Sequence, residues 1–202
     1  MISIIIPAFG AEPYLPHLIE EIKRFVEGDY EILIQSEKGF GRAILAGVER
    51  SKGDKIIIMD ADGSHNPKYI LEMLRKLSEA DMVIGSRYVA GGANMDAFAR
   101  RIASMLFCGA ARLLLRVSVR DPMSGFLALR KKVFDEIKVN PLGYKLGLEI
   151  IVKGGGKLRI LEHPIVFEKC KMGKASIKPS NFKYAAQTIL FMLKLITWHS
   201  RG

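Results

Sequence analysis

The stretch Lys55-Ile56-Ile57-Ile58-Met59-Asp60-Ala61-Asp62 decides the fold and indicates the chemistry. An apolar run of this kind predicts a buried strand, and two carboxylates follow its end two residues apart. In an open α/β sheet, ligands bind outside the carboxyl ends of the strands. Paired hard oxygen ligands at that place suit Mg²⁺ or Mn²⁺ held between the protein and a substrate pyrophosphate. Asp60 and Asp62 are therefore predicted to bind a divalent metal.

Strands and helices alternate on both sides of this stretch. Apolar, β-branched runs are typical of parallel strands that are covered on both faces, and an apolar stripe with a period of 3.6 residues indicates a helix. The expected strands cover 2–7, 31–35, 55–59 and 81–84, and the expected helices cover 12–25, 41–50 and 66–77. This alternation predicts an α/β fold with a mostly parallel sheet and flanking helices.

The second half of the chain has a less regular pattern. Helices are expected over 100–115 and 145–153, and a strand that could run antiparallel is expected over 125–130. A further strand over 159–167 is interrupted at Pro164, which is typical of a sheet edge. His65 has no second histidine at ligand spacing and is expected at a helix entry or in a loop, not as a metal ligand. Cys108 is expected to pack in an apolar helix, and Glu149 is either structural or paired with a buried basic group.

Basic residues exceed acidic ones by 31 to 21, which gives a net charge of +10. Such an excess favours an anionic partner, such as phosphates, an acidic membrane surface or nucleic acid. The chain has no zinc-binding spacing and no aromatic-studded RNA motif, so nucleic acid is not expected as a partner. Cys108 and Cys170 fit no CxxC pattern and are expected to be free thiols in a reducing compartment.

The last segment, 182–198, is predicted to be a helix that is apolar on most sides. It falls short of the roughly 20 apolar residues that a membrane-spanning helix needs. Four lysines precede or begin it: Lys171, Lys174, Lys178 and Lys183. Two alternatives stay open: the helix lies on an anionic bilayer, or it packs in the core or against a second copy of the chain.

Several motifs follow one another in a fixed order along the chain. They are Ile5-Ile6-Pro7, Lys38-Gly39-Phe40-Gly41, Met59 to His65, Val83 to Tyr88, Arg120 to Phe126, Gly143-Tyr144-Lys145 through Glu149, and Pro164 to Phe167. With these motifs the chain resembles the polyprenyl-phosphate (dolichol-phosphate) mannose and glucose synthases, which are family 2 glycosyltransferases of GT-A fold. The resemblance implies a GT-A-like domain over 1–180, followed by the terminal helix over 181–202.

The resemblance implies metal-dependent, inverting transfer of a hexose from GDP-mannose or UDP-glucose to a polyprenyl phosphate, at the cytoplasmic face of a membrane. Asp60 would line the sugar and ribose, Asp62 would coordinate the metal, and Arg87 would reach the phosphates. Asp121 would act as a base or as an orienter. The expected catalytic residues are Asp62, Arg87 and Asp121. The expected substrate-binding residues are Pro7, Ala8, Phe9, Lys38, Asp60, Ala61, Arg87, Arg100, Arg101, Ser124, Gly125 and Lys145.

The chain departs from the family pattern in two places. Ala8-Phe9-Gly10-Ala11 stands where the family has a small residue, an aromatic residue, Asn and Glu. About 20 residues, the size of one β-α step, are missing between the second strand and Lys38, where the family carries acidic residues that read the nucleobase. Two alternatives follow. One is a non-catalytic binding protein, and the other is an enzyme that glycosylates a glycan hydroxyl with Asp121 as its essential base.

Overall fold

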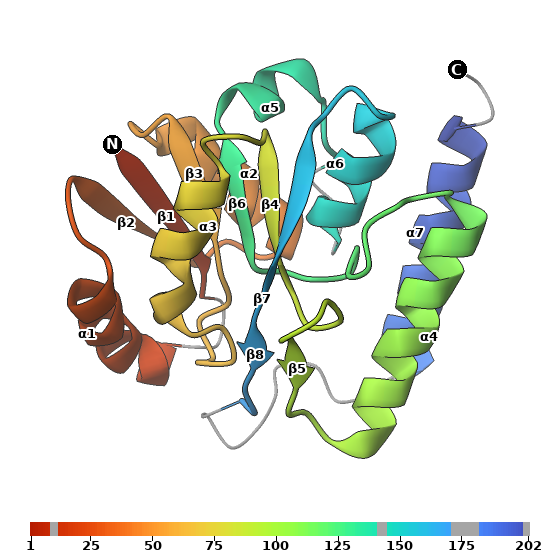
Figure 1. Cartoon of the computed structure of the whole chain (residues 1–202), viewed down its shortest axis with the longest axis horizontal. Helices are drawn as coiled ribbons and strands as arrows, with labels where there is room; N and C mark the ends of the chain where they lie inside the picture. Colours follow the sequence, from red (N-terminus) through yellow and green to blue (C-terminus); the bar gives the residue numbers. More distant parts are fainter. Residues whose placement is uncertain (9–11, 141–144, 171–181, 200–202) are drawn as a thin grey trace.

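A six-stranded sheet forms the centre of the molecule and has helices on both faces (Figure 1). The computed structural model describes all residues except 9–11, 141–144, 171–181 and 200–202, so Phe9, Gly143 and Tyr144 lie outside the described residues. The strand order is β2-β1-β3-β6-β4-β7. The strands are β1 (Ile2–Pro7), β2 (Tyr30–Gln35), β3 (Lys55–Ile58), β4 (Met82–Ser86), β6 (Leu127–Arg130) and β7 (Ile160–Pro164). The sequence prediction of an α/β fold is confirmed.

Most neighbouring strands run parallel, as predicted, and β6 is the exception. β1 pairs parallel with β2 and β3, and β4 pairs parallel with β7. β6 lies between β3 and β4 and runs antiparallel to both. Because β6 runs opposite to β3 and β4, it begins at the end of the sheet where those two strands finish. The residues just before Leu127 therefore join the carboxyl ends of β1, β3 and β4 at one edge of the sheet.

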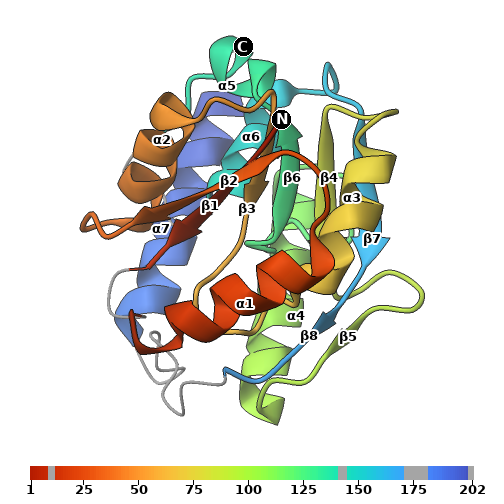
Figure 2. The same cartoon turned by 90° about the vertical axis from the view of Figure 1, so that its left-hand side faces the viewer.

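Helices cover the sheet in two layers (Figures 1 and 2). On one face, α1 (Leu15–Phe25) and α3 (Ile70–Lys76) share a buried cluster with the sheet, and a one-turn 3₁₀ helix precedes each of them. On the other face lie α2 (Phe40–Arg50), α4 (Phe98–Leu114), α5 (Lys132–Glu136), α6 (Leu146–Gly154) and α7 (Phe182–His199). The sheet thus has no face left open, which explains why its strands read as continuous apolar runs.

Successive residues of one strand serve opposite core layers. Ile4 and Ile6 point to the α1–α3 layer and Ile5 points to the α2 layer, and all three side chains are fully buried. Burial of one such side chain contributes about 1.5–3 kcal/mol. A Cβ at Gly47 of α2 would lie 2.6 Å from Cγ2 of Ile5, so the absence of a side chain there lets α2 approach β1 closely.

The structure corrects two parts of the predicted second half. The predicted single strand over 159–167 is two strands, because the chain leaves the main sheet at Pro164. β7 forms the sheet edge, and β8 (Val166–Phe167) pairs with β5 (Ala93–Asn94) in a small second sheet. The sequence interpretation also missed α5 and β5. Both are too short to display a hydrophobic period.

The terminal helix α7 has two different sides. Met192 and Leu195 are buried in the core cluster, whereas Ile189, Leu190 and Leu193 are exposed. α7 also contacts α6. Within the described ranges, no helix combines the length and apolar character needed to cross a bilayer. The predicted division of the chain near residue 180 stays a prediction.

Candidate functional site

Asp60 and Asp62 lie in a tight turn at the end of β3. Gly63 has a φ of +78°, and a Cβ on it would lie 2.7 Å from the ring of Tyr14, so the turn requires glycine. Oδ1 of Asp62 accepts hydrogen bonds from the backbone N–H of Ser64 at 3.0 Å and from its hydroxyl at 2.6 Å. These bonds fix the aspartate side chain through one of its two oxygens.

His65 holds the backbone of this turn and does not pair with the carboxylates. Its Nδ1 accepts a hydrogen bond from the N–H of Asp60 at 2.9 Å, so Nδ1 carries no proton. The distance of 3.8 Å between Nδ1 and Oδ2 of Asp60 is therefore not an ion pair. Burial lowers the pKa of His65, which keeps the ring neutral. The ring stacks on Phe126 at 5.0 Å between centroids. This fits the prediction of a loop residue.

The Asp60 carboxylate lies among charges of both signs. Its side chain is 36% exposed. Partial burial raises the pKa of Asp60 and the negative charge of Asp62 raises it further, while the positive charges of Lys145 and Arg87 lower it. Two carboxylates this close repel each other, and a divalent cation would relieve that repulsion.

The donor set fits a metal that arrives with a substrate. Within the described part of the chain, no group of three or more His, Cys, Asp or Glu side chains could hold a metal ion. Structural sites use closed sets of protein ligands, whereas Mg²⁺ is usually bound by one or two carboxylates plus substrate phosphates and water. Asp60 and Asp62 match the second pattern. Their assignment as metal ligands stays a prediction.

Arg87 and Asp121 form a buried ion pair between the end of β4 and the segment before β6. Oδ2 of Asp121 accepts from Nε of Arg87 at 2.7 Å and from its backbone N–H at 3.0 Å, and Oδ1 accepts from Nη2 at 2.7 Å. The Sγ of Cys108 lies 3.5 Å from Oδ1. Asp121 is fully buried, and Arg87 is 11% exposed.

This geometry favours one of the two roles expected for Asp121. A general base needs a free lone pair within reach of the proton that it removes. Asp121 uses both oxygens to hold Arg87 and is shielded from solvent, so it fits the role of an orienter and not that of a base. Cys108 is not merely packing, since its thiol faces this carboxylate. Burial, together with the negative charge of Asp121, raises the pKa of Cys108 to about 12.

Arg87 keeps donors available beyond this pair. A guanidinium group has five N–H donors, and Asp121 takes two of them. Burial lowers the pKa of Arg87, but the hydrogen bonds and charge of Asp121 raise it by more, so the group stays charged. Its Cζ lies 5.1 Å from the Tyr88 ring and 5.4 Å from the Phe167 ring. The expectation that Arg87 reaches substrate phosphates stays a prediction.

The segment before β6 lies next to Asp60 and Asp62 and contributes Ser124 and Gly125, and Lys145 donates a hydrogen bond to the same segment. The hydroxyl of Ser124 donates to the carbonyl of Gly85 at 2.7 Å and accepts from the N–H of Phe126 at 3.2 Å. Its side chain therefore shapes the loop, and the expectation that the backbone at Ser124 and Gly125 comes close to the substrate stays a prediction. A Cβ at Gly125 would lie 3.6 Å from Oδ2 of Asp60, so a large side chain there would cover the carboxylate. Lys145 donates to the carbonyl of Met123 at 3.1 Å.

The remaining predicted site residues lie partly beside Asp60 and Asp62 and partly elsewhere on the molecule. Pro7 ends β1 beside the acid pair, and Ala8 is buried there, as Ala61 is in the turn. Lys38 is exposed on the turn between β2 and α2, and Arg101 is exposed on α4. Their roles stay predictions.

Arg100 has an unusual environment on the first turn of α4. Its Nη1 pairs with Asp96 at 2.9 Å. Its Nε is buried and has no hydrogen-bond partner among the described residues. Buried donors are rarely left unsatisfied, so an anion bound at this end of α4 would complete the set.

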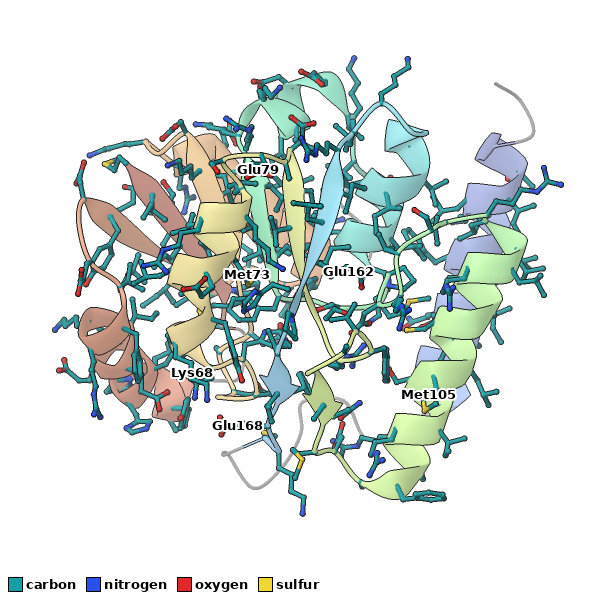
Figure 3. All side chains as sticks on the ribbon, viewed as in Figure 1. Lys68, Met73, Glu79, Met105, Glu162 and Glu168 are labelled. Atoms are coloured by element: carbon teal, nitrogen blue, oxygen red, sulfur yellow. The ribbon has the colours of Figure 1, made fainter. Side chains whose placement is uncertain are left out.

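Glu162 is a functional candidate that the sequence interpretation missed. It lies on β7 (Figure 3), and its two oxygens accept from the backbone N–H groups of Arg120 and Asp121. The only signal in the sequence is a carboxylate within a largely apolar edge strand. Glu149 is different, because it pairs with Lys153 at 2.6 Å and accepts from the N–H of Asn140. Of the two alternatives, pairing with a basic group is confirmed, although Lys153 is only partly buried.

Comparison with known proteins finds glycosyltransferases both among family models and among individual relatives. Residues 32–138 match the family described as glycosyl transferase family 2. A dolichol-phosphate mannosyltransferase of Pyrococcus furiosus is 29% identical over 98% of the chain, and a polyprenol monophosphomannose synthase of Mycolicibacterium smegmatis is 31% identical over 83% of it. The chain covers 64% of the length of each of these two relatives.

A solved structure supports the fold. Glucosyl-3-phosphoglycerate synthase from Mycobacterium tuberculosis, in complex with Mn²⁺, uridine-diphosphate-glucose and phosphoglyceric acid, matches with a TM-score of 0.71 and 15% identity. The match covers 98% of this chain and 80% of that one. The predicted GT-A-like fold is confirmed. The Pyrococcus match extends over 230 aligned positions, which is more than the 202 residues of the present chain, so the alignment contains gaps in this chain. The missing β-α step stays a prediction.

Proposed function

Since the chain belongs to glycosyl transferase family 2, we propose that it transfers a hexose from a nucleotide diphosphate sugar to the phosphate of a polyprenyl lipid. Two relatives that are named for dolichol-phosphate or polyprenol-phosphate mannose synthesis support this acceptor class. The Mn²⁺ and uridine-diphosphate-glucose bound by the solved neighbour support a metal-assisted nucleotide-sugar donor. GDP-mannose and UDP-glucose are the two donors that we propose.

The choice of acceptor rests on one observation, namely that both carboxylate oxygens of Asp121 accept hydrogen bonds from Arg87. Transfer to a sugar hydroxyl requires a base, and both oxygens of Asp121 are engaged by Arg87. The neutral ring of His65 has its unprotonated nitrogen engaged by Asp60 N–H. A phosphate is already an anion near neutral pH and needs no base. The site therefore favours a phosphate acceptor over a glycan hydroxyl.

The proposed reaction is a direct displacement at the anomeric carbon. An oxygen of the acceptor phosphate forms the new bond, the bond to the nucleotide diphosphate breaks, and the diphosphate leaves with the electron pair. No proton has to move. Asp60 and Asp62 would hold Mg²⁺ or Mn²⁺, which neutralises charge developing on the leaving diphosphate. Arg87 offers its remaining N–H donors to phosphate oxygens, and its charge also acts on Asp60.

The acceptor phosphate would bind near the start of α4. Arg100 presents a buried donor there that has no partner among the described residues, and exposed Arg101 adds a second positive charge. Both belong to the substrate-binding set expected from the sequence. Guanidinium groups suit this task because their N–H donors match phosphate oxygens in pairs.

Titration calorimetry and a transfer assay together test the proposed function. The full chain is titrated with GDP, UDP, GDP-mannose and UDP-glucose, with and without Mn²⁺, and then assayed with a polyprenyl phosphate and the radiolabelled donor. Metal-dependent binding of one donor, followed by a labelled lipid product, supports the proposal. If a folded protein binds none of these nucleotides, it is instead a non-catalytic binding protein, and the missing β-α step would be the reason.

We also propose that the protein acts at a membrane surface, which is where a polyprenyl phosphate resides. The outer side of α4 has an exposed apolar stripe: Phe98, Ile102, Met105, Leu106, Leu113 and Leu114. Figure 3 shows Met105 on this helix. Arg101, Arg112 and Arg116 are also exposed along α4 or just after it, and α7 lies on the same side of the molecule (Figures 1 and 2). An apolar stripe with basic neighbours suits an anionic bilayer.

A vesicle experiment tests this surface. We expect the double variant Phe98→Ser and Leu106→Ser to bind vesicles of phosphatidylglycerol and phosphatidylcholine about 100–1000-fold more weakly than the native chain, because burying each side chain in lipid contributes roughly 2 kcal/mol. Co-sedimentation measures the bound fraction. Ile34→Ser, which removes an exposed apolar side chain from β2, is the matched control and should bind like the native chain. Equal binding by all three proteins would reject α4 as the membrane surface.

A further inference from the structure

We propose that Glu162 is a positioning residue that sets the guanidinium of Arg87 by holding Asp121 in place. Glu162 lies on the edge strand β7, which contributes no residue to the site predicted from the sequence. Its consequence for sugar transfer rests on the proposed function. The positioning itself does not, because it concerns only contacts within the chain.

Glu162 holds the segment that carries Asp121 by its backbone. Its Oε2 accepts from the N–H of Arg120 at 2.8 Å, and its Oε1 accepts from the N–H of Asp121 at 3.0 Å. Two successive backbone N–H groups thus donate to one carboxylate. Because each oxygen accepts one of the two bonds, the carboxylate fixes both the position and the orientation of this peptide segment.

Asp121 transmits this constraint to Arg87. It accepts three hydrogen bonds from Arg87, two from the guanidinium and one from the backbone. The two guanidinium bonds are parallel and therefore fix the plane of the group. A shift of the Asp121 backbone would then rotate the remaining Arg87 donors, which we propose for substrate phosphate.

The position of Glu162 in the sheet makes it a rigid support. It pairs in register with Ile84 of β4, the strand that leads to Arg87. Its own carbonyl accepts from Nζ of Lys76 on α3 at 2.8 Å. These contacts form a closed circuit. Arg87 follows β4 and binds Asp121, and Asp121 is held by Glu162 on β7, which is paired with β4. Side chains supported in this way keep the geometry that phosphate binding needs.

Hydrogen exchange at Arg87 tests the positioning directly. The Nε–H of Arg87 donates to a buried carboxylate and should give a slowly exchanging signal in the ¹H–¹⁵N spectrum, which Arg87→Lys identifies by its loss. Glu162→Gln keeps the size of the side chain but places an NH₂ group against one backbone N–H. We expect the Arg87 signal to exchange at least about 10-fold faster in this variant. An unchanged exchange rate would overturn the proposal.

Glu31→Gln is the matched control. Glu31 lies on β2 at the opposite edge of the sheet and also accepts a backbone N–H, from Lys52 at 2.6 Å. If Glu162 only stabilised the fold, both variants would affect Arg87 exchange equally at matched thermal stability. Faster exchange confined to Glu162→Gln supports a positioning role, and equal acceleration in both variants contradicts it.

A double-mutant cycle tests the consequence for turnover. We expect Glu162→Gln to lower kcat/KM for transfer by about 10–100-fold in the native chain, but by no more than about 2-fold in the Arg87→Lys background, because residues that act through one another are not additive. Losses that multiply would overturn the proposed link to catalysis. A native chain without transfer activity would reject the proposed function instead, and the exchange measurement would still decide the positioning.

Discussion

Asp62→Asn should lower kcat/KM for sugar transfer by about 10³-fold, because it removes one negative charge from the pair that we propose to hold the metal. The substitution is mild for the fold. An asparagine Oδ1 can still accept the N–H and the hydroxyl of Ser64, so the turn after β3 keeps its bonds. The side chain stays the same size, and Gly63 and Tyr14 are not disturbed. The expected loss is therefore a loss of metal and diphosphate binding, not a loss of structure.

The measurement compares transfer kinetics, Mn²⁺ binding in the presence of nucleotide, and thermal stability. Asp54→Asn is the matched control, since Asp54 precedes the same strand at its other end and pairs with the N-terminus at 3.3 Å. We expect the control to keep its activity and Asp62→Asn to keep its thermal stability. If Asp62→Asn retained full turnover, or if native turnover were unchanged when EDTA removed the metal, the assigned role of Asp62 would be wrong.

The sheet could be predicted well from the sequence because its strands are buried on both faces. The β-branched runs of β1 and β3 predict buried strands with little ambiguity. Pro164 indicated an edge strand, and β7 ends at this residue. The place of β6 between β3 and β4 could not be derived in the same way. A short apolar run does not indicate which strands it will pair with.

The candidate site could be predicted only in part, for a related reason. Asp60 and Asp62 are neighbours in the sequence, and their position after a strand already indicated a site. Arg87 and Asp121 are 34 residues apart, and the antiparallel direction of β6 brings them together. Glu162 lies a further 41 residues along the chain. The sequence therefore identified Asp121 as important but could not indicate that its lone pairs were already engaged.

Asp121→Ala should destabilise the protein by about 3–5 kcal/mol, because it leaves the charge of Arg87 buried without a partner. This is a large share of the roughly 5–15 kcal/mol that separates folded from unfolded states of most domains. Arg87 is only 11% exposed and lies against the rings of Tyr88 and Phe167, so water cannot easily replace the lost carboxylate. Urea denaturation followed by circular dichroism gives the free energy of unfolding for each variant.

The double variant Arg87→Met and Asp121→Ala separates the charge effect from simple loss of packing. It removes both charges, so we expect it to be more stable than Asp121→Ala alone, although it contains one more substitution. A double variant less stable than Asp121→Ala would mean that the pair stabilises the fold by packing and not by charge.

Asp121→Asn tests whether the carboxylate acts as a base. If Asp121 were a base, the pH profile of kcat would lose a limb in this variant. If Asp121 holds Arg87, the variant should lose turnover at every pH, and Glu162→Gln should show a smaller loss of the same kind.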